Sequence, residues 1–174
     1  RNYLYNTQGP TGTGLIPNGQ SSAPTITIGM IDFNPTSTNQ DEEFIEIINP
    51  NSDAIDISGW TISNAVTHTI PKGTVIPAMD ASLPLANRLY LSPNPKAFRS
   101  RSTSPTSGES RFVQGPYSGH LSNFGETIEL SNPSGALVDG LTYTGTPSPA
   151  QLNLIVSEIM YHPAGNPDAE YLEL

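Results

Sequence analysis

Four acidic side chains in the first third of the chain are of the type that could bind a metal ion. They are Asp41, Glu42, Glu43 and Glu46, in the stretch DEEFIE. Calcium requires several carboxylate oxygens that converge on one point, usually from a loop with a glycine pivot. This stretch has no such glycine, and neighbouring residues of a strand point to opposite faces. We therefore predict a solvated acidic face with one hydrogen-bonded Glu and no metal site, these four acids being the candidate ligands.

The histidines are the next candidates for chemistry. His68, His120 and His162 are dispersed along the chain, and a catalytic His needs an acid or a nucleophile within hydrogen-bond reach. There are no Cys, and no paired-carboxylate or nucleophile motif is present. The glycine-rich stretch GPTGTG at residues 9–14 lacks the Lys-Ser/Thr of a phosphate loop. The sequence therefore predicts structural or surface histidines, no catalytic residue and no cofactor.

The single tryptophan, Trp60, has two interpretations. It could stack against sugar rings, with support from other aromatic residues. Alternatively, a Trp between Ile57 and Ile62 belongs to the core, because it buries a large apolar area. We prefer the core position. The supporting aromatics of the first interpretation would be Tyr90, Phe112, Tyr117 and Phe124.

The charge distribution excludes one class of partner. The net charge is −9, and seven acids without a base lie between Pro24 and Pro71, whereas six of the seven bases lie between Lys72 and Arg111. Binding to a phosphate backbone requires a cationic face, so we predict no nucleic-acid partner, with room only for a small basic rim around Arg99, Arg101 and Arg111. No apolar run approaches the roughly 18 residues of a membrane span, so we predict no membrane insertion.

The elements that must position these residues are short strands. The chain contains 17 Pro and 15 Gly, and turn signals recur every 8 to 12 residues or so, which indicates an all-β antiparallel sandwich. A first strand begins at Ile26 and ends near Pro35. A second covers residues 43–48, and its mixed faces suggest an edge position, a bulge or a hydrogen-bonded Glu.

Two further local elements are predicted. Residues 92–99 could hold one helical turn. Residues 125–143 form a hairpin around the turn at 132–135, with Ile128 and Leu130 facing Leu141 and Tyr143.

The end of the chain repeats its beginning. Residues 33–35 (FNP) align with residues 161–163 (YHP) at an offset of 128, and after a one-residue gap residues 43–46 (EFIE) align with 170–173 (EYLE). This period is too long for a solenoid unit and has the size of a whole domain.

Several motifs in this order resemble the lamin tail domain in its bacterial, secreted form. They are DEEFIEIINPNSDAIDISGWTIS, TIPKGTVIPA, LYLSPNPKAFRSR and LSNFGETIELSNPSGALVDGLTY, between about Ile26 and Tyr143. The stretch IVSEIMYHPAGNPDAEYLEL is similar to the opening of another copy. The resemblance implies an immunoglobulin-like fold in which Trp60, Gly125 and Glu126 are structural positions. Two departures, Gly29 against Ser157 and an insertion at residues 79–84, affect local loop shape.

The sequence divides into four parts. We predict a linker or the tail of an upstream domain at 1–24, the sandwich at 25–145, a linker extended by its prolines at 146–153, and the opening strands of a second, truncated repeat at 154–174. The start, RNYLYNT, is similar to the end of a CotH kinase-like domain.

The expected function is that of a non-catalytic interaction or spacer module in a multidomain extracellular bacterial protein. Its expected partner is a protein or cell-surface component, and any catalysis would lie in the upstream kinase-like region. The alternative is a carbohydrate- or calcium-binding accessory domain of a secreted enzyme. Residues 154–174 are expected either to self-associate, by pairing with an edge or replacing residues 26–47 of a neighbour, or to fold back over their own domain.

Overall fold

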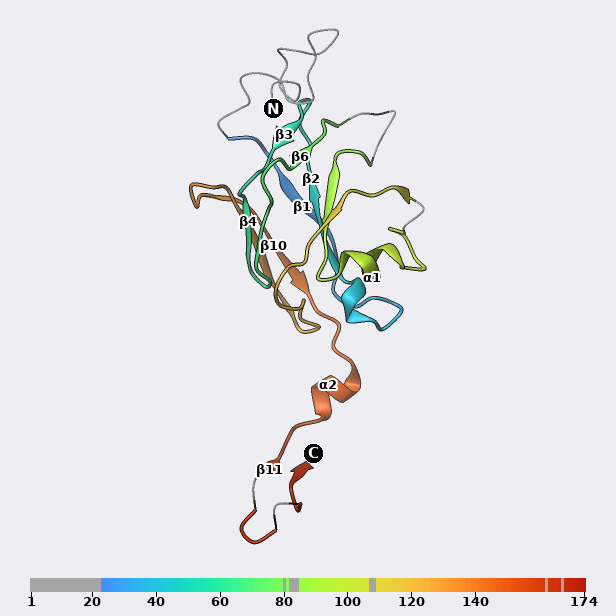
Figure 1. The fold of residues 1–174 in the computed structure, drawn as a ribbon, viewed down its shortest axis with the longest axis vertical. Helices are drawn as coiled ribbons and strands as arrows, with labels where there is room; N and C mark the ends of the chain where they lie inside the picture. The colour runs from blue at the N-terminus through green and yellow to red at the C-terminus, as the bar shows by residue number, and fades with distance from the viewer. Residues whose placement is uncertain (1–22, 80, 82–84, 107–108, 162, 167) are drawn as a thin grey trace.

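The computed structural model describes residues 23–79, 81, 85–106, 109–161, 163–166 and 168–174. Within these ranges two four-stranded sheets face each other, and a thin C-terminal extension follows (Figure 1). The first sheet has the order β1-β2-β7-β8, and the second has the order β10-β9-β4-β5. All neighbouring strands are antiparallel except β7 and β8, which are parallel. The predicted all-β sandwich is confirmed.

The strands are short, as the turn signals indicated. The first sheet contains β1 (Thr27–Asp32), β2 (Phe44–Ile48), β7 (Arg88–Leu91) and β8 (Val113–Gln114). The second contains β4 (Thr61–Asn64), β5 (His68–Thr69), β9 (Gly125–Ser131) and β10 (Leu137–Thr144). A small sheet at one end pairs β3 (Ile55–Asp56) with β6 (Val75–Ile76).

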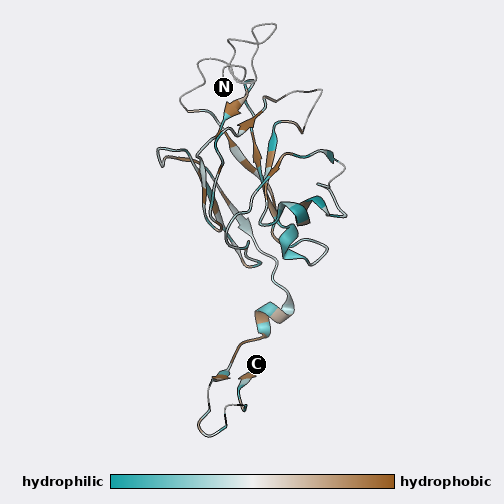
Figure 2. Cartoon of the chain, in the orientation of Figure 1, coloured by the Kyte–Doolittle hydropathy of each residue, from teal (hydrophilic) through white to brown (hydrophobic). Residues whose placement is uncertain are grey.

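The core lies between the two sheets. Ile45 and Ile47 from β2 meet Ile62 from β4 and Ile128 and Leu130 from β9, and all five are almost completely buried. A second cluster, Phe44, Tyr90 and Phe98, lies on the outer side of the first sheet. There α1 (Pro95–Arg99) and the 3₁₀ helix η1 (Gln40–Glu42) cover it with hydrophilic outer surfaces (Figure 2).

The position of β2 decides between the three explanations of its mixed faces. An edge position is wrong, because β2 lies between β1 and β7. The bulge is in the neighbouring strand β1, where the register shifts between Ile28 and Ile31. Both faces of β2 are covered and residues 44–47 are buried. The hydrogen-bonded Glu is confirmed, since Glu46 accepts hydrogen bonds from Tyr90 and Met30.

The predicted hairpin forms, with one change of register. Ile128 lies opposite Leu141, as expected. Leu130 instead lies opposite Asp139, and Tyr143 lies opposite Glu126. The expected pairing of Leu130 is wrong because the two strands are antiparallel: with Ile128 opposite Leu141, the residue two positions further along β9 lies opposite the residue two positions earlier in β10. A separate register shift lies between Leu137 and Asp139, beside the turn.

The predicted helical turn is α1, and its sequence explains where it begins. The side chain of Asn94 accepts hydrogen bonds from the backbone N–H groups of Lys96 and Ala97, each at 3.2 Å. Pro95 follows at the first helical position, where its missing N–H costs nothing.

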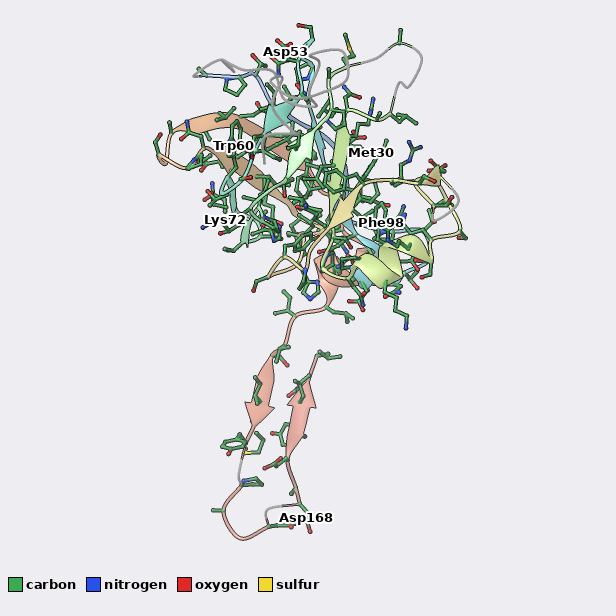
Figure 3. The ribbon with its side chains drawn as sticks, turned by 45° about the horizontal axis from the view of Figure 1, so that its top comes forward. Met30, Asp53, Trp60, Lys72, Phe98 and Asp168 are labelled. Atoms are coloured by element: carbon green, nitrogen blue, oxygen red, sulfur yellow. The ribbon has the colours of Figure 1, made fainter. Side chains whose placement is uncertain are left out.

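The C-terminal extension differs from the predicted extended linker. Residues 149–153 form a short helix, α2 (Pro149–Asn153), capped reciprocally by Ser148 and Gln151. The prolines do not extend the chain here, because Pro149 occupies the first helical position. Beyond α2, β11 (Glu158–Met160) and β12 (Tyr171–Glu173) pair in a two-stranded ribbon that projects away from the sandwich, with Asp168 near its tip (Figure 3).

Candidate functional site

The four candidate acids separate into two exposed and two buried groups. Asp41 is exposed and accepts a hydrogen bond from the Asn94 side chain at 3.1 Å, and Glu42, partly exposed, accepts one from Ser37 at 2.7 Å. Glu43 and Glu46 are buried, with exposed fractions of 0% and 3%. The prediction of a solvated face with one hydrogen-bonded Glu is therefore wrong in number: two of the four acids are buried and hydrogen-bonded, because β2 is an inner strand with both faces covered.

Glu43 fastens a distant loop to the start of β2. Its Oε1 accepts hydrogen bonds from the Tyr117 hydroxyl at 2.7 Å and the Leu121 backbone N–H at 3.1 Å. The Nδ1 of the largely exposed His120 lies 3.6 Å from the same oxygen. The other oxygen, Oε2, is buried without a partner among the described residues. Burial raises the pKa of Glu43, and the hydrogen bonds from Tyr117 and Leu121 oppose this rise.

Glu46 lies on the other face of β2 from Glu43 and contacts residues of β1 and β7. Its Oε1 forms an ion pair with Arg88 Nη1 at 2.6 Å and accepts a hydrogen bond from the Tyr90 hydroxyl at 2.8 Å. Its Oε2 accepts the backbone N–H of Met30, in the β1 bulge, at 3.0 Å. Desolvation, followed by the hydrogen bond to Glu46, raises the pKa of Tyr90 to about 12, so this phenol stays neutral and donates. One carboxylate thus ties β1, β2 and β7 together.

The structure does not bring the four candidate acids together around one point. Glu43, directly before β2, and Glu46, within β2, lie three residues apart and contact different partners. In the described part of the chain, no three His, Asp or Glu side chains are close enough to hold a metal ion. The arrangement favours structural roles for both buried carboxylates.

Arg101 also links separate segments of the chain. It is buried, so it does not belong to the basic surface rim predicted around Arg99, Arg101 and Arg111. Its exposed fraction is 6%, and its guanidinium donates to Asp32 Oδ2 and to the Glu42 carbonyl, both at 2.6 Å. The guanidinium carbon lies 5.0 Å from the centre of the Phe44 ring. Arg111 forms an ion pair with Glu109 at 3.0 Å.

The histidines are not brought together. Nδ1 of the buried His68 lies 3.1 Å from the Pro116 carbonyl, so this nitrogen carries the proton and donates. Burial lowers the pKa of His68, and its Nε2 has no partner among the described residues. His120 lies at the surface beside Glu43. His162 lies outside the described residues.

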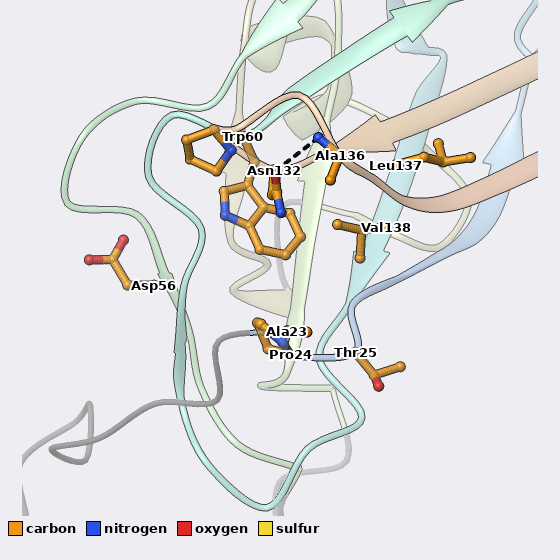
Figure 4. A pocket seen from close by; sticks show the side chains of 10 residues that line it. Ala23, Pro24, Thr25, Asp56, Trp60, Asn132, Ala136, Leu137 and Val138 are labelled. Atoms are coloured by element: carbon orange, nitrogen blue, oxygen red, sulfur yellow. Dashed lines mark hydrogen bonds between the residues drawn. The ribbon is translucent and has the colours of Figure 1, made fainter.

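A pocket of about 460 Å³ lies beside Trp60, between the first residues before β1 and the β9–β10 turn (Figure 4). Trp60 itself is 5% exposed, which places it in the core. The nearby polar groups are already engaged, since Asn132 Oδ1 accepts two turn N–H groups and Asp56 accepts the Ser58 N–H at 2.9 Å. The described lining includes none of the four aromatics that would support a sugar platform.

The comparison with protein families agrees with this arrangement. The model of the family described as Lamin Tail Domain matches residues 19–145. The chain belongs to the lamin tail domain family. No curated protein matches the chain. The lamin tail domain has an immunoglobulin-like β-sandwich fold, which is what the two facing sheets form, and this fold fits a non-catalytic module.

Gly125 and Glu126 begin β9 and lie against the last residues of the lamin tail domain, Tyr143 and Gly145. Gly125 has a φ of 86°, and a Cβ at this position would lie 2.6 Å from the Tyr143 carbonyl oxygen and 2.7 Å from the Gly145 nitrogen. Glu126 Oε1 accepts hydrogen bonds from the Ser122 N–H at 2.6 Å and the Tyr143 hydroxyl at 2.9 Å. These contacts hold the last strand of the lamin tail domain against the turn that precedes β9.

Sequence reasoning missed the partners of the buried acids. Arg88, Tyr90, Tyr117 and Arg101 were assigned no role with Glu43, Glu46 or Asp32. The one available signal was the mixed pattern of β2, because an acid between apolar residues on a buried strand requires hydrogen-bond donors nearby. The pattern shows that donors are needed and does not show which residues supply them.

Proposed function

We propose that the lamin tail domain of this chain is an interaction and spacer module of a multidomain extracellular bacterial protein. The partner is a protein or a cell-surface component, and the chain itself performs no catalysis. The proposal is supported by the use of its buried charged groups, since Glu43, Glu46 and Arg101 are all engaged in holding strands and loops together.

The observation that carries the spacer role is the path of the chain through the sandwich. The chain enters β1 at the end that carries β3 and β6, and β10 leaves at the opposite end, where α2 follows (Figure 1). Segments attached at the two sides are therefore held apart by the length of the sandwich. The chain packs tightly where it leaves β10. A side chain on Gly145 would overlap backbone atoms of residues 123–125.

The extracellular and bacterial context rests on the sequence resemblance. The motifs between Ile26 and Tyr143 are similar to those of secreted bacterial members, and RNYLYNT is similar to the end of a CotH kinase-like domain. Within the described residues, no helix has the length and apolar character needed to cross a membrane. Protease treatment of intact cells that produce the parent protein tests the location: cleavage of this module before lysis is expected.

Two spin labels test the spacer role. The chain has no Cys, so Thr25→Cys and Thr144→Cys would give two labelled sites at the two ends of the sandwich. Pulsed electron resonance should find one narrow distance distribution, because the strands between the labels are fixed by the core. A broad or multiple distribution would overturn the spacer role.

The pocket beside Trp60 supports a second candidate function, carbohydrate binding. Its size is within the range of small-ligand sites. Isothermal titration with soluble polysaccharides tests this function, with Leu137→Glu as the variant that places a charge at the pocket rim. Calcium binding has no such support, because Glu43 and Glu46 have other partners.

A further inference from the structure

The pocket beside Trp60 contains two hydrogen-bond donors that the sandwich does not use. The indole Nε1–H of Trp60 has no partner in the described part of the chain, although the residue is only 5% exposed. The side-chain Nδ2–H groups of Asn132 have no partner there either. Neither nitrogen is fully enclosed by protein atoms, so both reach the pocket. In the view of Figure 4 the indole nitrogen lies on the side of the ring toward Asp56.

The amide and carboxylate acceptors in the lining are, in contrast, already in use. Asn132 Oδ1 accepts the Ser134 N–H at 3.0 Å, the Ser134 hydroxyl at 2.6 Å and the Ala136 N–H at 3.1 Å. These three donors fix which end of the Asn132 amide is the oxygen, so its nitrogen is the end left over. Asp56 Oδ1 accepts both the N–H and the hydroxyl of Ser58. A ligand that fits this pocket must therefore supply acceptors.

The rest of the lining adds two further requirements. Much of it is apolar, including Pro24, Pro133 and Leu137. Asp56 is the one charged residue of the described lining, and the surrounding residues 24–71 contain seven acids and no base. A matching ligand is therefore apolar, rich in acceptors, poor in N–H and O–H donors, and positively charged at its flanks.

A proline-rich segment has this combination of properties. Proline keeps its carbonyl acceptor but has no N–H that would need an acceptor in return. In the polyproline II conformation the carbonyl groups make no internal hydrogen bonds, and the shape exists before binding, so little entropy is lost. A sugar matches less well, because each of its hydroxyl groups also brings a donor that needs an acceptor.

We propose that the pocket beside Trp60 binds an extended, proline-rich segment of a partner protein that carries Lys or Arg at its flanks. The Trp60 and Asn132 N–H groups donate to carbonyl oxygens of the segment. Its prolines pack against Pro24 and Pro133, and Asp56 attracts the flanking cations. This assignment rests on the interaction role proposed above and names the class of partner.

Nuclear magnetic resonance tests the site directly, because the chain has a single Trp and so a single indole N–H signal. The probe is a blocked hexaproline peptide with an arginine at each end, titrated into the isotope-labelled full chain. The indole signal should shift downfield and saturate, because the N–H then donates to a carbonyl. The same peptide with a glutamate at each end should bind about tenfold more weakly, and added salt should reduce this difference.

Asn132→Asp removes one of the two donors and keeps the turn. The new side chain retains the oxygen that accepts the Ser134 and Ala136 N–H groups and places a second oxygen where the nitrogen was. The dissociation constant of the arginine-flanked peptide should rise about tenfold, which corresponds to one lost hydrogen bond. Because the added negative charge alone would attract the arginines, a weaker complex identifies the lost donor.

Asn39→Asp is the matched control. Asn39 is exposed, lies outside the pocket and caps η1 by accepting the Asp41 N–H at 3.2 Å. This variant makes the same chemical change and should bind the peptide as the wild type does. Trp60→Phe removes the other donor and keeps an aromatic ring. It should also weaken binding about tenfold, measured from the backbone signals of Ala136 and Leu137.

Failure of this site and failure of the spacer role give different results. The spin labels report on the sandwich without any ligand. A narrow distance distribution together with no peptide binding would therefore overturn the pocket assignment alone.

Three results of the titrations would contradict the assignment. One is an indole signal that does not move at millimolar concentrations of the arginine-flanked peptide. The second is an Asn132→Asp variant that binds this peptide as tightly as the wild type. The third is tighter binding of cellohexaose than of the peptide in the same titration, which would assign the pocket to a sugar.

Discussion

At the residue scale, the buried charges of this protein act as fasteners. Glu43 joins β2 to the loop that contains Tyr117 and Leu121, and Glu46 joins β2 to β1 and β7. Each carboxylate replaces lost hydration with hydrogen bonds, which is the condition for burying a charge. The two side chains differ in how many of their oxygens accept hydrogen bonds. Both oxygens of Glu46 have partners, whereas Oε2 of Glu43 has none in the described part of the molecule.

Glu43 should make stability depend on pH. Burial raises its folded pKa above the ordinary value of 4.5, so the folded protein binds this proton more tightly than the unfolded chain. The resulting stabilisation is complete below pH 4.5 and is lost as the pH rises through the raised pKa. In Glu43→Gln this loss is absent, so the free energy of unfolding of the variant, relative to the wild type, should increase with pH.

Guanidinium melts from pH 4 to about 8 would measure this difference. Tyr117 and His120 also face Glu43, and the pKa of Tyr117 is raised by burial, so the phenol stays neutral over this range. Glu170→Gln, which removes an exposed carboxyl of the ribbon, is the control and should follow the wild-type profile. Parallel profiles for Glu43→Gln and the wild type would contradict the assignment.

Trp60 should contribute to stability through its buried area. Trp60→Ala should reduce the free energy of unfolding by about 3–5 kcal/mol, because the cavity cannot be refilled by neighbouring strands. Leu137→Ala removes an exposed side chain near the same pocket and should cost about 0.5 kcal/mol or less. A loss below about 1 kcal/mol for Trp60→Ala, together with the loss of a measured glycan affinity, would favour the sugar platform instead.

At the element scale, the end of the sandwich is held by two glycines in contact. The turn before β9 and the residue after β10 approach so closely that a Cβ on Gly125 would collide with the backbone at Tyr143 and Gly145. Glu126 completes this junction by bonding Ser122 and Tyr143. The direction in which the chain leaves the sandwich is therefore set by backbone packing at the last strand.

Gly125→Ala and Gly135→Ala form a matched pair that tests this junction. Both residues have positive φ, 86° and 83°, but nothing lies within 4 Å of a Cβ at Gly135. Gly135→Ala should cost about 1–2 kcal/mol for the left-handed backbone alone. Gly125→Ala should cost about 1–3 kcal/mol more, because the backbone must also move. Equal losses in thermal or denaturant melts would show that the close contact is unimportant.

At the scale of the whole molecule, the protein is a rigid sandwich followed by a short helix and a free ribbon (Figure 1). The sandwich sets a distance between what lies before β1 and what lies after β10. The ribbon repeats the pairing of β1 with β2, and in the described part of the chain no third strand pairs with it. Nearly all of its described apolar side chains are exposed.

The whole chain should lack catalytic turnover. The candidate acids either fasten strands or lie apart at the surface, and His68 and His120 have separate surroundings. We expect no activity above background on a panel of phosphoesters, peptides and glycans. Turnover that survives repurification, and that is lost in a variant of a named residue, would contradict a purely non-catalytic role.

Much of the local structure could be predicted from the sequence. The strands around Ile28, Ile45 and Ile128, the helical turn after Asn94 and the turn at 132–135 all follow from alternation, capping and turn residues. The repeat of residues 26–47 in 154–174 was also visible. These features depend on neighbours within a few residues, so the chain carries their signals locally.

Only the tertiary structure decided which acids are buried, which residues they contact and how the strands are ordered in the sheets. Glu43 meets Tyr117 across 74 positions, and Glu46 meets Tyr90 across 44, because β2 is an inner strand of the sheet. A change of register, as between Leu137 and Asp139, alters which side chains meet. Whether a carboxylate is solvated or buried depends on which distant strands cover it, and alternation along one strand contains no information about that.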